Sequence, residues 1–211
     1  MRGRRSLTPF RMPVCGMTAR RQAPHAPPPP PAMPDRTNLH DAALRHLARY
    51  ATTQAGLLRV LSRRIDRWAR ATQAEPEAIA PLLALARAEV AALAASGLVD
   101  DAAFAASRAR SLTRAGRSRR AVTAHLAQRG VDQEILEAAL PEDAETELAA
   151  ALLVARKRRI GPFGPPEPDM AARHKALGTL ARAGFSQETA RRALAMDHAE
   201  AEDRIIRLRR D

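Results

Sequence analysis

The chain has 211 residues, 45% of them hydrophobic but only 3% aromatic, which suits one large domain or a few small helical units. Its formal net charge of +12 favours a polyanionic partner such as nucleic acid, a nucleoprotein or an anionic membrane. The single cysteine, Cys15, excludes an internal disulfide framework and favours a reducing compartment. We expect no membrane span, because no apolar run approaches about 18 residues.

Residues 1–34 differ in composition from the rest of the chain. They contain six arginines, no acid and nine of the sixteen prolines, so they carry half of the net positive charge. Such a segment buries too little apolar surface to offset the entropy of ordering, which predicts a disordered, partly polyproline tail. An anion-binding arm and a dispensable extension both stay open as its role, and so does a functional start at Met33.

The apolar residues are mostly Ala and Leu, which predicts an all-α fold. Asn38 is the expected N-cap of the first helix. A second helix carries an apolar stripe with the spacing i, i+4, i+8 and i+11, formed by Leu57, Leu61, Ile65 and Trp68. A third stripe reaches from Ile79 to Leu93 and predicts a helix that is kinked by Pro81 and ends at Gly97.

The remaining helices are expected between turn signals. We predict helices over residues 101–114, 118–129, 133–140, 144–159, 170–183 and 187–194, followed by a basic helix over residues 199–210. The Gly and Pro content of IGPFGPPEPD, residues 160–169, excludes regular structure in that segment.

Two segments at a fixed offset of 54 residues are similar to each other. LAQRGVDQEILEAAL, residues 126–140, and LARAGFSQETARRAL, residues 180–194, share seven of fifteen positions. In both, a glycine is followed by an apolar residue and then by Asp or Ser, and a related turn follows Gly97. Glycine can end one helix in the left-handed conformation and the polar residue can cap the next, so the sequence predicts repeated helical units.

The adjacent acids Asp100 and Asp101 fit the same turn. Asp100 is the expected N-cap, and Val99 and Phe104 take the positions of a hydrophobic staple around it. Asp101 then occupies the first helical position, where its charge meets the positive end of the helix dipole. The competing interpretation is a hydrolase that uses both carboxylates, which requires a metal or another functional group nearby.

Other catalytic patterns do not occur in the sequence. The six histidines have no metal-ligand spacing, and there is no G-x-x-x-x-G-K-[ST], no G-x-S-x-G and no C-x-x-C. We therefore expect no cofactor, no metal site and no enzymatic activity.

Clusters of basic residues are the remaining candidates for binding a partner. The candidate partner-binding residues are Arg63, Arg64, Arg117, Arg119, Arg120, Arg156, Lys157, Arg158, Arg159, Arg173 and Lys175. Arg120 lies nearly opposite Val122 on its predicted helix, so we expect it to be exposed. The alternative role is structural, because basic residues in the last turn of a helix, such as RKRR at residues 156–159, interact favourably with its negative end.

The segment that begins GLVDDAAFAASRAR, and the turns that follow it, resemble the RecX family of RecA regulators. The residues that carry the resemblance are Gly97, Asp100, Asp101, Phe104, Gly116 and Gly130, with Gly184 and Phe185 in a closing element. The resemblance covers roughly residues 38–195. Residues 66–80 depart from it, because the glycine turn that the family has in its first unit is missing.

The resemblance implies an all-α, elongated and curved array of three tandem three-helix repeats. Together with the turns, it divides the chain into a tail, three repeats and a basic helical extension, over residues 1–36, 37–97, 98–141, 142–196 and 197–211. It implies a non-enzymatic protein that binds the RecA filament on single-stranded DNA and inhibits recombinase and ATPase activities, which modulates recombination and the SOS response. A weak direct contact with DNA stays open, and from the composition we expect a cytoplasmic protein. We further expect a monomer without membrane contact. The alternative is a basic helical DNA-binding protein that acts without RecA.

Overall fold

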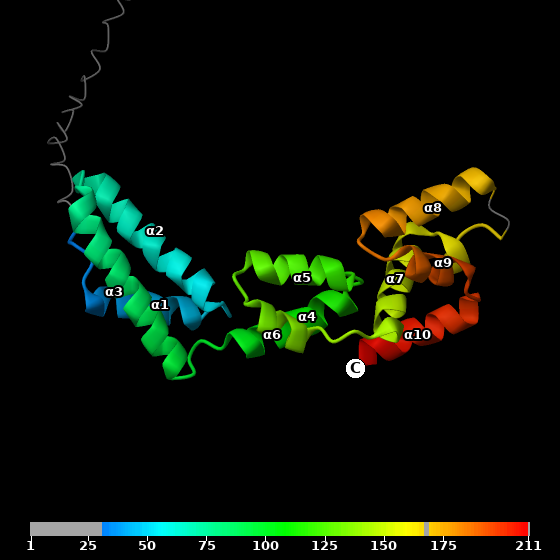
Figure 1. Ribbon diagram of the computed structural model, residues 1–211, viewed down its shortest axis with the longest axis horizontal. Coiled ribbons are helices and arrows are strands. Elements are labelled where there is room, and N and C mark those ends of the chain that lie inside the picture. The colour runs from blue at the N-terminus through cyan, green and yellow to red at the C-terminus, as the bar shows by residue number, and fades with distance from the viewer. Residues whose placement is uncertain (1–30, 167–168, 211) are drawn as a thin grey trace, which may run out of the picture. The chain divides into compact units, whose positions relative to one another are not determined.

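The computed structural model describes residues 31–166 and 169–210, and the predicted tail over residues 1–30 lies outside them. The described residues form ten α-helices and one turn of 3₁₀-helix and contain no strand, which confirms the all-α prediction (Figure 1). Three clusters of buried side chains organise these helices. We use the clusters to define three helix groups, each with a core of its own.

Group 1 consists of α1 (Arg36–Leu47), α2 (Gln54–Thr72) and α3 (Pro76–Ala95). The apolar stripe predicted for the second helix is confirmed as the buried face of α2. The expected cap at Asn38 is wrong, because α1 begins earlier, after the N-cap Asp35. Asn38 instead closes a capping box, in which each of these two side chains accepts the backbone N–H of the other residue.

The long helix α3 has a length and composition that membrane spans and the core helices of folded domains share. By length and composition alone, this 20-residue helix is long and apolar enough to cross a membrane. It nevertheless packs against α1 and α2, with Leu82, Val90 and Leu93 buried in the core of group 1. Its Glu89 is only 4% exposed and lies 2.6 Å from Nδ1 of His40 on α1, so a polar contact also fixes α3. The helix continues through Pro81.

Group 2 consists of α4 (Asp101–Arg114), α5 (Arg119–Gln128) and α6 (Gln133–Ala139), each within one residue of its predicted bounds. Its small core is formed by Ala105, Ala109, Val122, Leu126, Val131, Leu136 and Leu140. The predicted cap is confirmed, since Asp100 accepts the Ala103 N–H at 2.9 Å. The expected staple pair is divided between two cores, because Val99 packs into the core of group 1 and Phe104 packs against that of group 2.

Group 3 consists of α7 (Ala144–Arg158), η1 (Gly161–Phe163), α8 (Met170–Arg182), α9 (Gln187–Ala195) and α10 (His198–Arg210). The α-helices agree with their predicted bounds within one residue. The exclusion of regular structure over residues 160–169 is wrong for the 3₁₀ turn η1. Gly161 begins this turn with a φ of 59°, and the missing N–H of Pro162 costs nothing in a first turn.

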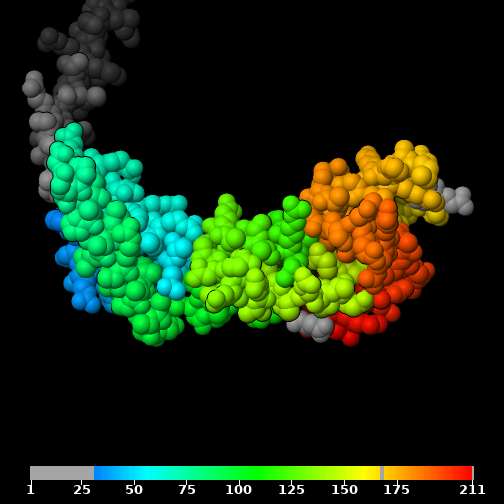
Figure 2. All heavy atoms as spheres, in the orientation of Figure 1, coloured from blue at the N-terminus to red at the C-terminus, as the bar shows by residue number. Residues whose placement is uncertain are grey.

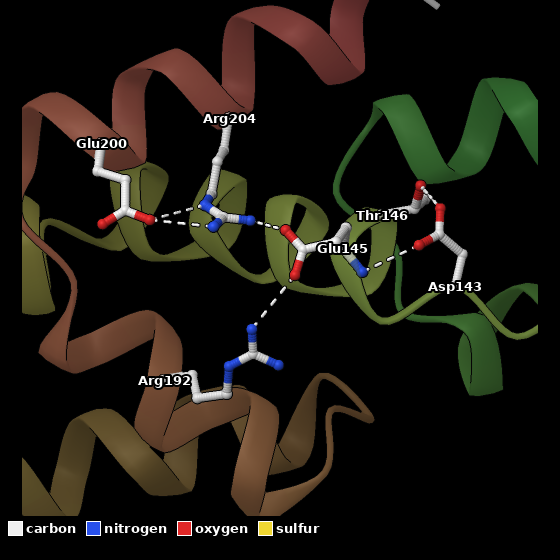
Figure 3. Close-up of polar contacts among 6 residues, drawn as sticks. All are labelled: Asp143, Glu145, Thr146, Arg192, Glu200 and Arg204. Carbon is white, nitrogen blue, oxygen red and sulfur yellow. Dashed lines mark hydrogen bonds and ion pairs between the residues drawn. The ribbon is translucent and has the colours of Figure 1, made fainter.

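An ion-pair network attaches α9 and α10 to the start of α7 (Figure 3). Glu145 of α7 pairs with Arg192 of α9 at 3.3 Å and with Arg204 of α10. Arg204 also pairs with Glu200, one turn earlier on α10, at 3.0 Å. Ile205 of α10 is fully buried in the core of group 3, so the predicted basic extension packs as part of that group.

The predicted glycine turns have the left-handed backbone that they require. The φ angles are 75° at Gly97, 83° at Gly130 and 95° at Gly184, which confirms the prediction for all three turns. In group 1, where the glycine is missing, Gln73 ends α2 in the same conformation, with a φ of 51°. Within residues 66–80, Gln73 therefore adopts the left-handed conformation that a glycine has in the other turns.

Group 1 is joined to group 2 through the start of α2. Thr53, the N-cap of α2, is 1% exposed and donates its hydroxyl to the carbonyl oxygen of Arg129 at 2.7 Å. Arg129 is the C-cap of α5. The next backbone N–H, that of Gln54, donates to Oδ1 of Asp101 at 2.8 Å. This first joint therefore pairs the start of one helix with the end of α5 and the start of α4.

The second joint, between groups 2 and 3, repeats this arrangement at the start of α5. Ser118, the N-cap of α5, is fully buried and donates its hydroxyl to the carbonyl oxygen of Ala183 at 2.7 Å. Ala183 is the C-cap of α8. The N–H of Arg119 donates to Oε2 of Glu147 on α7 at 2.8 Å. Hydroxyl, carbonyl, N–H and carboxylate thus have the same roles at both joints.

Both joints also depend on the glycine that follows the C-cap. A Cβ on Gly130 would lie 2.4 Å from the Cβ of Ala55, and a Cβ on Gly184 would lie 2.5 Å from Oγ of Ser118. A Cβ on Gly97 would meet nothing within 4 Å. Gly130 and Gly184 are therefore required for close approach as well as for their backbone conformation.

Candidate functional site

The paired acids Asp100 and Asp101 accept backbone N–H groups from two different helices. Asp100 accepts from Ala103 on its own helix, and Asp101 accepts from Gln54 at the start of α2. Burial raises the pKa of Asp101, against the opposing effect of the Gln54 N–H. Asp100 therefore caps α4, and Asp101 connects the start of α4 to the start of α2. Within residues 31–166 and 169–210, no group of three His, Cys, Asp or Glu is arranged to hold a metal ion.

Exposed arginines line the face of α2 that is opposite its buried stripe; α2 forms the cyan surface in Figure 2. Arg63, Arg67 and Arg70 each follow a buried residue by two positions, which is about 200° around the helix. In the described part of the chain, none of the three forms an ion pair. Asp66 lies on the same face and offsets part of their charge. Arg64, which the sequence also proposed, is exposed on another side.

The candidate cluster at residues 117–120 is divided between the surface and an internal contact. Arg119 is half-buried, and its Nε donates to the carbonyl oxygen of Leu140 at 2.9 Å. Its guanidinium also pairs with Glu142 at 3.5 Å, so this side chain holds α5 against the end of α6. Arg117 and Arg120 are exposed.

Arg117 belongs to a basic cluster in group 2 that is centred on His125. Nε of Arg108 lies 3.4 Å from Nε2 of His125. Burial, and then the positive charges of Arg108, Arg129 and Arg117, lower the pKa of His125. These four residues, the His125 cluster, come from α4, α5 and the segments that flank α5. The cluster is a region of concentrated positive charge next to the first joint.

The run RKRR at the end of α7 has more than one role. Arg156 pairs with Glu202 of α10 at 3.0 Å, and Nζ of Lys157 lies 3.4 Å from the carbonyl oxygen of Ala115 at the end of α4. These two side chains support the packing of neighbouring helices. Arg158 is exposed, and Arg159 ends α7 in the left-handed conformation with a φ of 53°.

Arg159 also lines a cleft of about 920 Å³ that η1, α8, α9 and α10 form in group 3. The basic residues in its lining are Arg159, Arg173, Arg191 and His198, and the apolar ones include Ile160, Leu177 and Leu194. The acid in the lining, Asp197, accepts a backbone N–H of α10 at 2.8 Å. This group 3 cleft brings together Arg159 and Arg173, which the sequence proposed as parts of separate clusters.

The arginines that the sequence reasoning missed differ in the signals they leave. Arg67 and Arg70 follow Arg63 at i+4 and i+7, a helical spacing that the sequence displays. Arg191 and Arg129 reach their sites only through tertiary contacts, for which no local pattern exists. Lys175, which the sequence proposed, is exposed on α8 but is not part of the cleft lining.

Comparisons with known proteins place these helices in one family. A family model described as "RecX, second three-helix domain" matches residues 100–140. The regulatory protein RecX of Myxococcus xanthus (strain DK1622) is 41% identical over 163 residues, which cover 75% of this chain and 84% of that protein. The regulatory protein RecX of Halorhodospira halophila (strain DSM 244 / SL1) is 33% identical over 157 residues, 74% of this chain and 86% of that protein.

A solved structure shares the fold. The structure titled "Crystal structure of regulatory protein RecX" matches with a TM-score of 0.53 and 20% sequence identity, over 75% of this chain and 70% of that chain. At this identity the likeness shows the fold alone. The sequence relatives confirm the resemblance that the glycine turns and Asp100 suggested. The chain therefore belongs to the RecX family of regulatory proteins.

Proposed function

We propose that this protein binds the RecA filament on single-stranded DNA and inhibits its growth, its ATP hydrolysis and strand exchange. By this action it modulates homologous recombination and the SOS response. The observation that supports the proposal is family membership, since a relative named regulatory protein RecX is 41% identical over 84% of its own length. The relatives are named as regulatory proteins, so we propose a role in binding and no catalysed reaction. We further propose that the protein acts as a monomer in the cytoplasm.

The distribution of basic residues supports binding to a polyanionic filament. Group 1 has the arginines of α2, group 2 has the His125 cluster and the exposed Arg120, and group 3 has the basic cleft and the exposed Arg158. Each arginine that neutralises a phosphate releases counterions, so affinity falls as salt rises. Several basic surfaces on one chain therefore predict a steep salt dependence.

A co-sedimentation assay with RecA filaments on single-stranded DNA tests the proposal. The protein is expected to sediment with the filaments, less so at each higher salt concentration, and to slow the DNA-dependent ATPase of RecA. Filaments that are confirmed to be present and that neither bind the protein nor lose ATPase activity would rule out this function.

The α2 arginines provide a test at the level of residues. Arg63→Ala/Arg67→Ala/Arg70→Ala is expected to weaken filament binding and to reduce its salt dependence, while the helical circular dichroism signal stays unchanged. The matched control replaces the same three residues with Lys, which keeps their charge. Arg117→Ala/Arg120→Ala probes group 2 in the same way and leaves Arg119 in place, because Arg119 holds α5 against α6. Unchanged binding by a variant shows that its arginines are only solvated.

The alternative, a DNA-binding protein that acts without RecA, is favoured by one observation. The helices α4 and α5 are joined by a short turn at Gly116, and α5 presents Arg120 and Gln128 to solvent. A recognition helix reads bases with such polar side chains. Tight, sequence-selective binding to duplex DNA without RecA would favour this alternative over filament binding.

A further inference from the structure

We propose that the cleft between groups 1 and 2 binds single-stranded nucleic acid, with a base stacked on Tyr50 and the adjacent phosphates against Arg108 and Arg129. This site goes beyond the proposed function, because it assigns direct contacts with a base and with phosphates to named residues of this chain. It is tested without RecA, so its failure and the failure of filament binding are separate results.

The cleft has the size of a site for a small ligand. Its volume is about 650 Å³, within the range of roughly 300–1,000 Å³ that ligand pockets occupy. The end of α1 and the linker to α2 form one side, Leu98 and Val99 lie before α4, and the exposed side of α4 completes the wall. Arg129 contributes from the end of α5.

An exposed aromatic ring lines this cleft. Among the described Phe, Trp and Tyr side chains, Tyr50 is the one that is largely exposed, at 60%. The ring of His46 lies against it, with ring centroids 5.2 Å apart. Leu98, which is 57% exposed, lines the same cleft. An exposed ring beside further apolar surface gives a nucleic-acid base a platform on which to stack.

Positive charge adjoins this ring. Arg108 and Arg129 line the cleft, and both belong to the His125 cluster, with Nε of Arg108 3.4 Å from Nε2 of His125. The backbone of Arg129 is fixed by the first joint, because its carbonyl oxygen accepts the Thr53 hydroxyl. The one acid in the lining, Asp100, already accepts the Ala103 N–H at 2.9 Å. Two guanidinium groups are therefore available for phosphates at a site that also offers stacking.

This combination favours a single strand over other ligands. A duplex keeps its bases stacked inside, so it has no base for Tyr50, whereas the bases of a single strand are accessible. The hydroxyls of Ser107 and Ser111 in the lining can hydrogen-bond to the edge of any base, so the site predicts little sequence preference. A protein segment with acidic residues and an apolar anchor is the competing ligand, and the test below distinguishes it.

The test compares two probes that carry the same number of phosphates. One is a fluorescently labelled twelve-nucleotide oligothymidylate, and the other is an abasic strand of the same length; both are titrated with the full chain in the absence of RecA. The oligothymidylate is expected to bind more tightly. Tyr50→Ala should weaken the binding of the oligothymidylate by about tenfold or more, to the level of the abasic strand. The same substitution should leave the affinity for the abasic strand unchanged. Tyr50→Phe, which keeps the ring, should bind as the unmodified protein does.

The phosphate contacts are tested with Arg108→Ala/Arg129→Ala. This variant is expected to bind both probes more weakly, with the slope of log affinity against log salt reduced by about 1.4, or roughly 0.7 for each phosphate contact with a single strand. Arg110→Ala is the matched control, because Arg110 is exposed on α4 but does not line the cleft. It should leave both affinities and the salt slope unchanged.

The ring of His125 gives a second readout that does not depend on the label. Phosphates that neutralise Arg108 and Arg129 should raise the pKa of His125, which an NMR titration of its ring protons follows. Equal affinities for the two probes, together with no effect of Tyr50→Ala, would overturn the proposal. A different result would overturn it in favour of a protein ligand. In that case Tyr50→Ala leaves the affinity for the oligothymidylate unchanged but abolishes saturable binding of an acidic peptide with an aromatic anchor.

Discussion

Thr53 and Ser118 have the same role at two successive joints of this protein. Each is the buried N-cap of the second helix in its group, and each hydroxyl accepts a backbone N–H of its own helix, from Gly56 at 2.9 Å and from Ala121 at 3.3 Å. Each also donates to the C-cap carbonyl of the next group's second helix at 2.7 Å. Because helix ends leave backbone groups without partners, one hydroxyl here satisfies the ends of two helices.

Ser118→Ala should destabilise the protein more than the loss of a cap alone. Removal of a capping hydroxyl costs about 1 kcal/mol, and leaving the carbonyl of Ala183 without its partner adds about 1–3 kcal/mol. The control is Ser186→Ala at the start of α9, where the exposed hydroxyl accepts the Thr189 N–H at 3.0 Å. Urea unfolding followed by circular dichroism compares the two. Equal losses would show that the bond across the joint contributes nothing.

Gly130→Ala and Gly97→Ala separate backbone strain from packing at the first joint. Both glycines have a positive φ, so alanine is strained at either position by about 1–2 kcal/mol. Only at Gly130 does the new Cβ also meet a neighbour, 2.4 Å from the Cβ of Ala55. Overpacking of this kind adds about 1–3 kcal/mol. Gly130→Ala is therefore expected to have the lower urea midpoint, and identical midpoints would contradict a tight joint.

The helices could be predicted largely because their ends carry local signals. Gly97, Asp100 and the alanine-rich segment after them define the start of α4 within a few residues of sequence, and the structure agrees with the prediction to the residue. The start of α1 was wrong because two cap residues, Asp35 and Asn38, stand three positions apart and only their mutual hydrogen bonds identify the true cap. A helix start can therefore be predicted from the sequence where only one nearby residue can serve as its N-cap.

The joints could not be predicted because their partners are far apart in the chain. Nothing near Thr53 indicates that its hydroxyl meets Arg129, and nothing near Asp101 indicates that it accepts the N–H of Gln54. The same limit applies to the candidate site. The exposure predicted for Arg120 from its place opposite Val122 is confirmed, but no local signal showed that Arg119, proposed as a binding residue too, turns toward Leu140.

Asp101→Asn should change how stability depends on pH. Burial raises the pKa of Asp101 above its ordinary value of 3.8, and burial likewise raises that of Glu147 above 4.5. An acid with a higher pKa in the folded state keeps its proton there while the unfolded chain loses it. The contribution of the Asp101 carboxyl to the free energy of unfolding therefore falls as pH rises from its ordinary pKa of 3.8 to its raised pKa in the folded protein.

Asn at position 101 keeps an oxygen that accepts the Gln54 N–H and removes the ionisation. The variant should be at least as stable as the unmodified protein at neutral pH, with a shallower fall in stability from about pH 4 upward. Asp101→Ala, which loses the acceptor as well, should be less stable at every pH. Urea unfolding over a pH series measures all three. A steeper fall for Asp101→Asn would mean that the Gln54 hydrogen bond outweighs burial.

Glu145→Ala and Ile205→Ala compare the two ways in which α10 is attached to group 3. The side chains in the ion-pair network remain 60% exposed at Glu145, 45% at Arg192 and 25% at Arg204. Pairs with this much solvent contribute about 0–1 kcal/mol each. Ile205 is fully buried, and its truncation should cost about 2–5 kcal/mol. We therefore expect Ile205→Ala to lower the urea midpoint more than Glu145→Ala does. Hydrogen exchange of the α10 amides should rank the two variants in the same order, and the reverse order would mean that Glu145, by holding α9 and α10 together, carries the attachment.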